Sequence, residues 1–168
     1  SGTRVLILDV RGNGGGGEDE AGRVATWFLD EGGVYASHRY RDKNAPDGWT
    51  PMRSRRIDAN QPGRRYPGKV LVLQGPVCVS SNEAFLEMMR LAPRATSIGD
   101  TSGGSSANPR TFDLPNGAKV TLPRWQSYKH DGSLLEGHGI DPDVRITGDF
   151  TNDDPVLREA LRLAREGR

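Results

Sequence analysis

Hydrophobic residues gather in two short runs that are typical of strands buried on both faces. The first run, Leu6-Ile7-Leu8, lies within the segment from Arg4 to Val10, and the second is Lys69-Val70-Leu71-Val72-Leu73. Polar residues bound each run, and a glycine- or proline-bearing turn comes after it. A short apolar run with such boundaries favours a buried strand over a helix. The pattern therefore predicts two core strands.

Three longer segments carry apolar residues at helical spacing. They are Glu18 to Leu29, the segment that opens at Ser80-Ser81-Asn82 and ends before Pro93, and Asp154 to Arg168. Shorter strands are expected at Val34 to Ala36 and Thr96 to Gly99, and a hairpin at Phe112–Leu114 and Ala118–Leu122. Strands that alternate with helices predict an α/β fold, with residues 1–168 as a single domain.

The region from Arg39 to Pro67 differs from the rest of the chain. It is polar and basic, and four prolines interrupt it. Prolines disfavour regular structure, so we expect mostly loop, with some strand such as Trp49 to Arg53. The basic stretch Arg53 to Arg65 is expected to be a solvated loop, with a partner-binding patch as the alternative.

The overall charge is almost balanced. The chain has 23 Lys and Arg against 22 Asp and Glu, so no overall field attracts nucleic acid or an anionic membrane, and we expect neither partner. No apolar run reaches the roughly 18 residues of a membrane span. Cys78 is the single cysteine, which excludes an intrachain disulfide and a cysteine-based metal site, and its apolar neighbours predict a core residue.

The run Gly12-Asn13-Gly14-Gly15-Gly16-Gly17 allows three interpretations. Gly12, Gly14 and Gly17 satisfy the spacing of a dinucleotide-binding loop, but a run this rich in glycine matches it almost automatically. A flexible turn is the simplest alternative. The third interpretation is an oxyanion hole, because glycines let backbone N–H groups face a developing negative charge.

Ser80 comes after a strand and a turn and opens an apolar helix. With Glu83 it forms the sequence of a capping box, a purely structural role. The same position suits a nucleophile, because free N–H groups and the helix dipole at a helix start stabilise negative charge. The N–H of Ser81 is then a natural oxyanion donor, and a glycine turn nearby would supply the second one.

Five segments together resemble the C-terminal-processing (tail-specific) serine peptidases and their tricorn-like relatives. They are Leu8-Asp9-Val10-Arg11-Gly12-Asn13-Gly14-Gly15-Gly16, Ser80-x-x-Glu83, Ile98-Gly99-Asp100-Thr101-Ser102-Gly103-Gly104, Leu114-Pro115-Asn116-Gly117, and Glu136-Gly137-His138-Gly139-Ile140-Asp141-Pro142-Asp143-Val144. They occur in the order of that family and cover nearly the whole chain.

The resemblance implies a ClpP- or crotonase-like core of stacked β-β-α units. It implies Ser80 as the nucleophile, with an oxyanion hole formed by the N–H groups of Ser81 and of Gly15 or Gly16. It implies a polypeptide substrate and no cofactor. The processing branch has a lysine about 25 residues after its nucleophile, but this chain has Gly104-Ser105-Ser106 there, which places it with the tricorn-like and interphotoreceptor retinoid-binding protein-like branch.

In that branch a histidine from an earlier segment activates the serine, and a glutamate near the "E-G-x-G" motif supports the arrangement. Glu136 is the matching residue. His38 and His130 lie in polar stretches and are expected to be solvated, whereas His138, inside the Glu136 motif, is a weak candidate for the base. We therefore expect residues 1–168 to be a fragment that lacks upstream segments, with the general base outside it and little activity alone.

Two rival functions stay open. One is a non-catalytic module that binds a peptide or an apolar ligand, as the retinoid-binding relative does. The other is an acyl-CoA enzyme of the crotonase superfamily, which also uses backbone N–H groups but needs no serine nucleophile. The resemblance alone favours an extracytoplasmic location, periplasmic or secreted, and it is compatible with an oligomer.

Overall fold

The structure is a computed structural model that describes residues 2–147 and 153–166. The strands are β1 (Val5–Asp9), β2 (Gly33–Tyr40), β3 (Arg53–Ile57), β4 (Lys69–Gln74), β5 (Ala95–Gly99), β6 (Arg110–Asp113), β7 (Lys119–Leu122), β8 (Trp125–Lys129) and β9 (Val144–Arg145). The helices are α1 (Glu18–Ala25), α2 (Ser81–Met89) and α3 (Pro155–Glu166). The predicted α/β class is confirmed.

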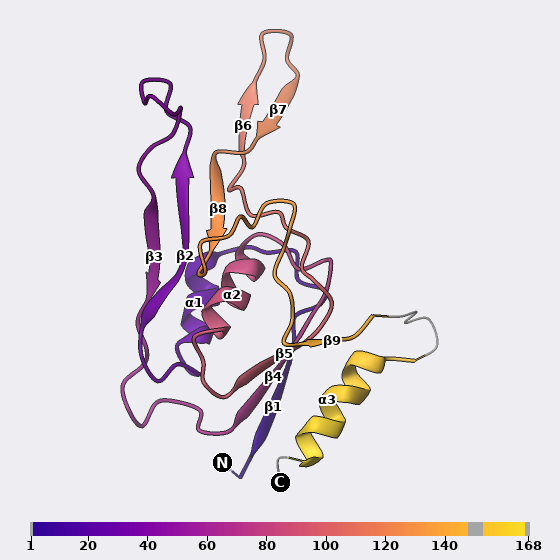
Figure 1. Ribbon diagram of the computed structural model, residues 1–168. Coiled ribbons are helices and arrows are strands. Elements are labelled where there is room, and N and C mark those ends of the chain that lie inside the picture. The colour runs from indigo at the N-terminus through magenta and orange to yellow at the C-terminus, as the bar shows by residue number, and fades with distance from the viewer. Residues whose placement is uncertain (1, 148–152, 167–168) are drawn as a thin grey trace.

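A four-stranded parallel sheet with the order β1-β4-β5-β9 forms the centre of the molecule (Figure 1). Side chains of β4 alternate between its two faces. Leu71 and Leu73 belong to the apolar cluster of α3, whereas Val70 and Val72 belong to the cluster of α1 and α2. The strand β4 is therefore buried on both faces, as its apolar run predicts.

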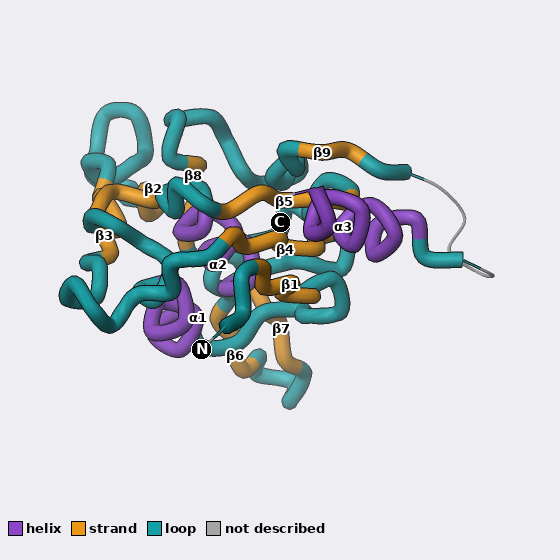
Figure 2. Tube along the Cα trace, turned by 90° about the horizontal axis from the view of Figure 1, so that it is seen from below, coloured by secondary structure: helices purple, strands orange, loops and turns teal. Residues whose placement is uncertain are grey.

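Helices cover both faces of this sheet, and a second sheet completes the core. Figure 2 shows α3 lying along β4 and β5. Helix α2 is packed between the parallel sheet, α1 and the antiparallel sheet β3-β2-β8, so that residues from Asn82 to Met89 are all buried. An eight-residue run without an exposed side chain is typical of a central helix.

Three expectations from the sequence need correction. The helix predicted from Glu18 to Leu29 ends at Ala25, and the chain then turns so that Leu29 enters the core. The strand predicted within Trp49–Arg53 instead forms at Arg53–Ile57. This basic segment is not simply a solvated loop, because Arg55 is buried and pairs with Glu18 of α1.

The hairpin β6–β7 forms where predicted and projects away from the core (Figure 1). Its pairing places polar side chains on one face, where Thr111 bonds Thr121 and Asp113 pairs with Lys119. The opposite face carries Phe112, Val120 and Leu122 together with Arg110, whose guanidinium lies over the Phe112 ring, and Leu114 comes just after β6. Phe112, Leu114 and Leu122 are each more than 40% exposed.

The predicted last helix is confirmed as α3, although Arg168 lies outside the described residues. Arg11, just after β1, holds the start of this helix through a bidentate contact with Asp154 at 2.8 Å and also pairs with Asp9. Among the described helices, none combines the length and the apolar character that a bilayer crossing requires.

Candidate active site

Sheet topology brings the glycine turn and the Ser80 segment together. The strands β1 and β4 are parallel neighbours, with Asp9 opposite Leu73. Their carboxyl ends meet at one edge, where ligands of open parallel sheets bind. The glycine turn leaves β1 at this edge, and the segment that leads to Ser80 leaves β4 at the same edge.

Ser80 adopts an unusual backbone conformation, with φ 59° and ψ −130°. A residue with a side chain rarely adopts such angles, and it does so only where the surroundings over-determine it. The Ser80 N–H donates to the Ser105 carbonyl at 2.8 Å and lies 3.2 Å from Glu83 Oε2. These contacts hold the strained residue at the start of α2.

Glu83 is completely buried and accepts hydrogen bonds with both carboxylate oxygens. Its Oε1 accepts from Ser102 Oγ at 2.6 Å and from the Gly104 N–H at 2.8 Å, and its Oε2 accepts from the Ser105 N–H at 3.0 Å as well as from Ser80. The capping box that the sequence predicts is present. Glu83 also ties the loop of residues 102–105 to the Ser80 segment, a role that spacing alone does not reveal.

The Gly15 backbone lies directly against the Ser80 side chain. A Cβ atom at Gly15 would lie 2.7 Å from Ser80 Cβ and 3.2 Å from Ser80 Oγ. Gly15 also has φ +104°, which side-chain-bearing residues rarely adopt. Glycine is therefore required at this position for two independent reasons, and it permits the close approach of the turn to the serine hydroxyl.

The two glycines expected to donate to an oxyanion differ in their bonding. The Gly15 N–H already donates to Asn13 Oδ1 at 2.9 Å. Within residues 2–147 and 153–166, neither the Gly16 N–H nor the Ser81 N–H has a hydrogen-bond partner. Ser81 Oγ donates to the Gly16 carbonyl at 2.7 Å and so links the two residues.

Further bonds fasten the turn to α2. Asn82 Nδ2 donates to the carbonyls of Val10 and Asn13 at 3.0 and 2.9 Å. Cys78 is buried in the core, as expected, and its Sγ lies 3.2 Å from the Val10 carbonyl. Burial raises the pKa of the Cys78 thiol, which makes it a poor nucleophile.

Glu136 lies on the other side of the loop that carries Ser105 and Ser106. Its Oε2 accepts from the Ser106 N–H at 3.2 Å, and the Ser106 side chain in turn lies 3.4 Å from the Ser80 carbonyl. Glu136 Oε1 is buried and has no hydrogen-bond partner among the described residues. Burial raises the pKa of Glu136, and the nearby Glu83 carboxylate adds to this rise.

A cavity of about 290 Å³ opens beside Ser80. Residues of the loop from Asp100 to Pro109 contribute to it. The lining residues are Gly16, Glu18, Ser80, Ser81, Ser106, Asn108, Pro109 and Trp125. Neither a lysine nor a histidine is among them. Of the described residues that line the cavity, Glu18 is the one acidic residue, and its carboxylate is already engaged by Arg55 and the Tyr35 hydroxyl, which makes it a poor general base.

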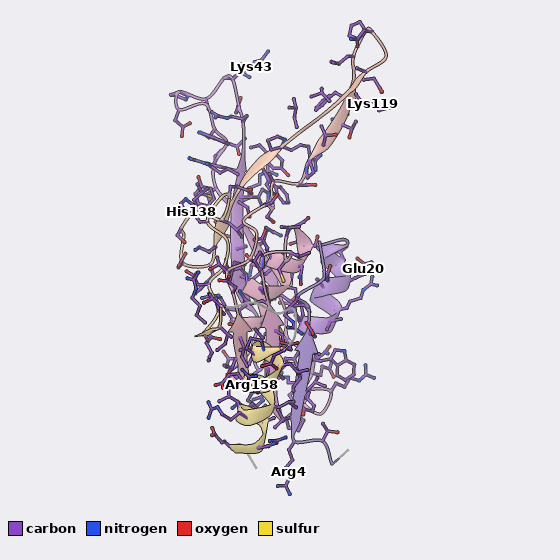
Figure 3. All side chains as sticks on the ribbon, turned by 90° about the vertical axis from the view of Figure 1, so that its right-hand side faces the viewer. Arg4, Glu20, Lys43, Lys119, His138 and Arg158 are labelled. Carbon is purple, nitrogen blue, oxygen red and sulfur yellow. The ribbon has the colours of Figure 1, made fainter. Side chains whose placement is uncertain are left out.

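The three histidines lie in different surroundings. The expectation that His38 is solvated is wrong, because it is 9% exposed and its ring lies 4.3 Å from that of Trp125. Burial lowers the pKa of His38, and Arg55 and Arg53 lower it further. The His130 side chain is partly exposed and contacts the buried Glu87. His138 is exposed and lies across the molecule from Glu20 (Figure 3).

Sequence reasoning missed two residues that shape this cavity. Trp125 lines it and donates from Nε1 to the Ser106 carbonyl, and Ser106 is buried behind Ser80. Trp125 belongs to no motif at a recognisable spacing, and the sequence marks Ser106 only as part of the Gly104-Ser105-Ser106 segment that stands where the processing branch has its lysine. Among the described residues, no group of three or more His, Cys, Asp or Glu side chains is arranged to hold a metal ion.

The fold and the motifs match known proteins. Residues 1–146 match the family described as "Peptidase family S41". The chain is 28% identical over 148 residues to a "Probable CtpA-like serine protease" of Staphylococcus epidermidis (strain ATCC 12228 / FDA PCI 1200), a match that covers 87% of this chain and 28% of that protein. The chain thus spans little more than a quarter of this relative.

Solved structures show the same fold. A crystal structure from Parabacteroides merdae ATCC 43184 has a TM-score of 0.85 at 29% identity and covers 96% of this chain and 52% of that one. The tricorn protease has a TM-score of 0.68 at 21% identity, with 98% of this chain and 15% of that chain covered. The recognition of a serine peptidase family from five motifs is confirmed, and the chain belongs to peptidase family S41.

Proposed function

We propose that this chain forms the nucleophile-bearing core of a serine peptidase, with Ser80 as the nucleophile. The observation that carries the proposal is the placement of the Ser80 side chain against Gly15, next to two N–H groups without partners in the described chain, those of Gly16 and Ser81. Two such donors beside a serine hydroxyl suit the tetrahedral intermediate of acyl transfer. An N–H group that faces solvent carries no desolvation penalty, so it can remain without a protein partner until a substrate oxygen binds.

The proposed reaction is the hydrolysis of a peptide bond in two steps. Ser80 Oγ attacks the scissile carbonyl carbon while a general base takes its proton, and the carbonyl oxygen becomes an oxyanion between the two N–H groups. The base then gives its proton to the leaving amine, and the C–N bond breaks. Water attacks the resulting ester in the same manner, releases the acid and restores the Ser80 hydroxyl. Of the two glycines, Gly16 is the proposed donor because the Gly15 N–H is engaged by Asn13.

Glu136 is proposed to orient the general base rather than to act as the base. Its partnerless Oε1 is an acceptor, and a neutral imidazole N–H is a fitting donor for it. Since no described residue makes this bond, we propose that residues 1–168 form one core unit of a longer peptidase, and that the base lies in polypeptide outside them. This arrangement corresponds to the branch of the family that uses histidine in place of lysine.

Labelling with a fluorophosphonate probe tests the proposal. The natural full-length protein should be labelled on Ser80, located by mass spectrometry of the digested protein, and Ser80→Ala should remove the label. Ser106→Ala is the matched control, because Ser106 lines the same cavity and the variant should keep the label. The proposal is contradicted if the label persists in Ser80→Ala. It is also contradicted if the folded full-length parent protein is never labelled.

Among the described residues, the Ser80 cavity is lined by no lysine or histidine, and this favours one alternative. In this alternative the chain is a non-catalytic module that binds a peptide or an apolar ligand on the same fold. Failure of the full-length protein to react with the probe, together with ligand that co-purifies with it, would select this module. Retention of full acyl-CoA turnover in Ser80→Ala would instead point to a crotonase-type enzyme.

A further inference from the structure

A second cavity adjoins the proposed oxyanion donors. It has a volume of about 310 Å³, and it is lined by Val10, Asn13, Gly15, Gly16, Gly17, Glu20, Ala21, Val24, Ser81, Asn82 and Phe85. Gly16 and Ser81 line both this cavity and the one beside Ser80. The two proposed oxyanion donors therefore lie on the ridge between two hollows, and a peptide bound across the ridge would place a side chain in each.

The interior of the second cavity is apolar. Phe85 is buried at its base, and Val10, Ala21 and the half-exposed Val24 surround it. Such a surface stabilises the hydrocarbon part of a side chain by removing it from water. The volume is sufficient for a long, unbranched side chain.

Glu20 is the single charged residue among those that line this cavity. It belongs to the first turn of α1 and projects outward from that helix (Figure 3). Its carboxylate lies over the Gly17 backbone, in space that a Cβ atom at Gly17 would occupy. Within the described residues, the Glu20 carboxylate has no ion-pair or hydrogen-bond partner.

The neighbouring acidic residues differ from Glu20. Glu18 is neutralised by Arg55 and also contacts the Tyr35 hydroxyl. Asp19 is exposed and does not line the cavity. An apolar base with one uncompensated carboxylate at its mouth matches a side chain that has a hydrocarbon stem and a cationic end.

We propose that this cavity, lined by Phe85 and Glu20, selects lysine or arginine at a substrate position next to the scissile bond. The cavity disfavours aspartate, glutamate and a free terminal carboxylate there, because Glu20 repels them. This inference rests on the proposed peptidase function and names the substrate class of the same site. Glu20 is a specificity-determining residue in this view and takes no part in the bond-breaking steps.

Binding of paired peptides tests the inference without requiring catalysis. Acetylated and amidated hexa-alanine peptides, each with one Lys or one Glu at successive positions, are titrated into the full-length Ser80→Ala protein by calorimetry. At one position Lys should bind about 5-fold more tightly than Glu, the upper range for an exposed ion pair. This preference should shrink as salt is raised.

Charge reversal supplies the decisive comparison. Glu20→Lys should invert the preference, so that the Glu peptide binds better, whereas Asp19→Lys makes the same change of charge one residue away and should leave the preference in place. Equal binding of Lys and Glu peptides, or equal effects of the two variants, overturns the inference. Fluorophosphonate labelling is measured in parallel on the Glu20→Lys and Asp19→Lys variants with Ser80 intact, so that loss of the proposed catalysis and loss of the proposed selectivity are recorded separately.

Discussion

Ser80 and Glu136 flank the same loop, yet their hydrogen-bond surroundings differ. Around Ser80, the backbone N–H has two acceptors, and the Glu83 carboxylate is saturated with donors from the loop. Around Glu136, one carboxylate oxygen is bonded to Ser106 and the other is buried without a partner in the described residues. The comparison indicates that contacts within this chain fix the position of Ser80, the proposed nucleophile, whereas one oxygen of Glu136 lacks a partner among the described residues.

The largest expected effect comes from removing the carboxylate behind Ser80. Glu83→Ala leaves three donors without an acceptor in the interior, those of Ser102, Gly104 and Ser105, and it removes one of the two acceptors of the Ser80 N–H. We expect a loss of about 3 to 5 kcal/mol in the free energy of unfolding, measured by urea denaturation. The exposed Glu31→Ala serves as control and should change this free energy by less than about 0.5 kcal/mol. Similar effects of the two variants would show that the Glu83 bonds contribute little.

The next effect concerns the contact between the glycine turn and the serine. Gly15→Ala forces a Cβ atom to within 2.7 Å of Ser80 Cβ at a positive φ. We expect a destabilisation of about 1 to 3 kcal/mol by thermal or urea unfolding, and displacement of the turn. Gly14→Ala is the matched control, because a Cβ atom there meets nothing within 4 Å. An equal cost at both glycines would contradict the tight contact.

A smaller effect is expected at the link between Ser81 and the turn. Ser81→Ala removes the hydrogen bond from Ser81 Oγ to the Gly16 carbonyl but keeps the Ser81 N–H. The free energy of unfolding should fall by about 1 kcal/mol, and hydrogen exchange of the Gly15 amide, which is bonded to Asn13 Oδ1 in the same turn, should accelerate. Ser54→Ala, on an exposed position of β3, should change neither quantity. Unchanged exchange at Gly15 in Ser81→Ala would show that the turn holds its shape without this bond.

The smallest effect is a pH dependence at Glu136. Because burial raises its pKa above the ordinary value of 4.5, the folded protein binds this proton more tightly than the unfolded chain does. Stability attributable to Glu136 is therefore highest below 4.5 and is lost as pH rises through the raised pKa. Glu136→Gln lacks this loss, so its melting temperature relative to the parent protein should increase between pH 4 and pH 7.

Melting curves at several pH values measure this difference. Titration of the other carboxylates is common to both proteins and cancels in the comparison. A difference that stays constant over this range, or that changes in the opposite direction, would show that Glu136 is not held in a desolvated site. In the proposed longer peptidase, a donor for Glu136 Oε1 would reduce this pH-dependent difference in melting temperature. Such a reduction would show that Glu136, unlike Ser80, depends on a partner outside residues 1–168.

Local patterns in the sequence account for the elements that build the Ser80 side of the site. The two apolar runs predict neighbouring strands, and the turns after them carry the glycines and Ser80. The helix start at Ser80 is visible from the apolar residues after it. Features set by spacing along one strand or helix are therefore predictable, and the family motifs add the pairing of the two turns.

The residues that the sequence does not predict owe their positions to contacts between distant segments. Arg55 is inward-facing because Glu18, 37 positions earlier, pairs with it. His38 is buried because β8 brings Trp125 against it. A hydropathy pattern does not reveal a buried arginine or histidine when the residue that pairs with it or packs on it lies far along the chain. A basic segment that contains one buried residue therefore has the same sequence pattern as a solvated loop.

The two-faced hairpin β6–β7 has a consequence for handling the isolated chain. On its apolar side Phe112 and Leu122 are each more than 40% exposed, and a lone two-stranded ribbon has little intrinsic stability in water. Concentrated solutions should self-associate through this ribbon and brighten a dye such as anilinonaphthalene sulfonate. Exchanging Phe112 and Leu122 for threonine should yield a better-behaved sample for spectroscopy while the serine cavity keeps its shape.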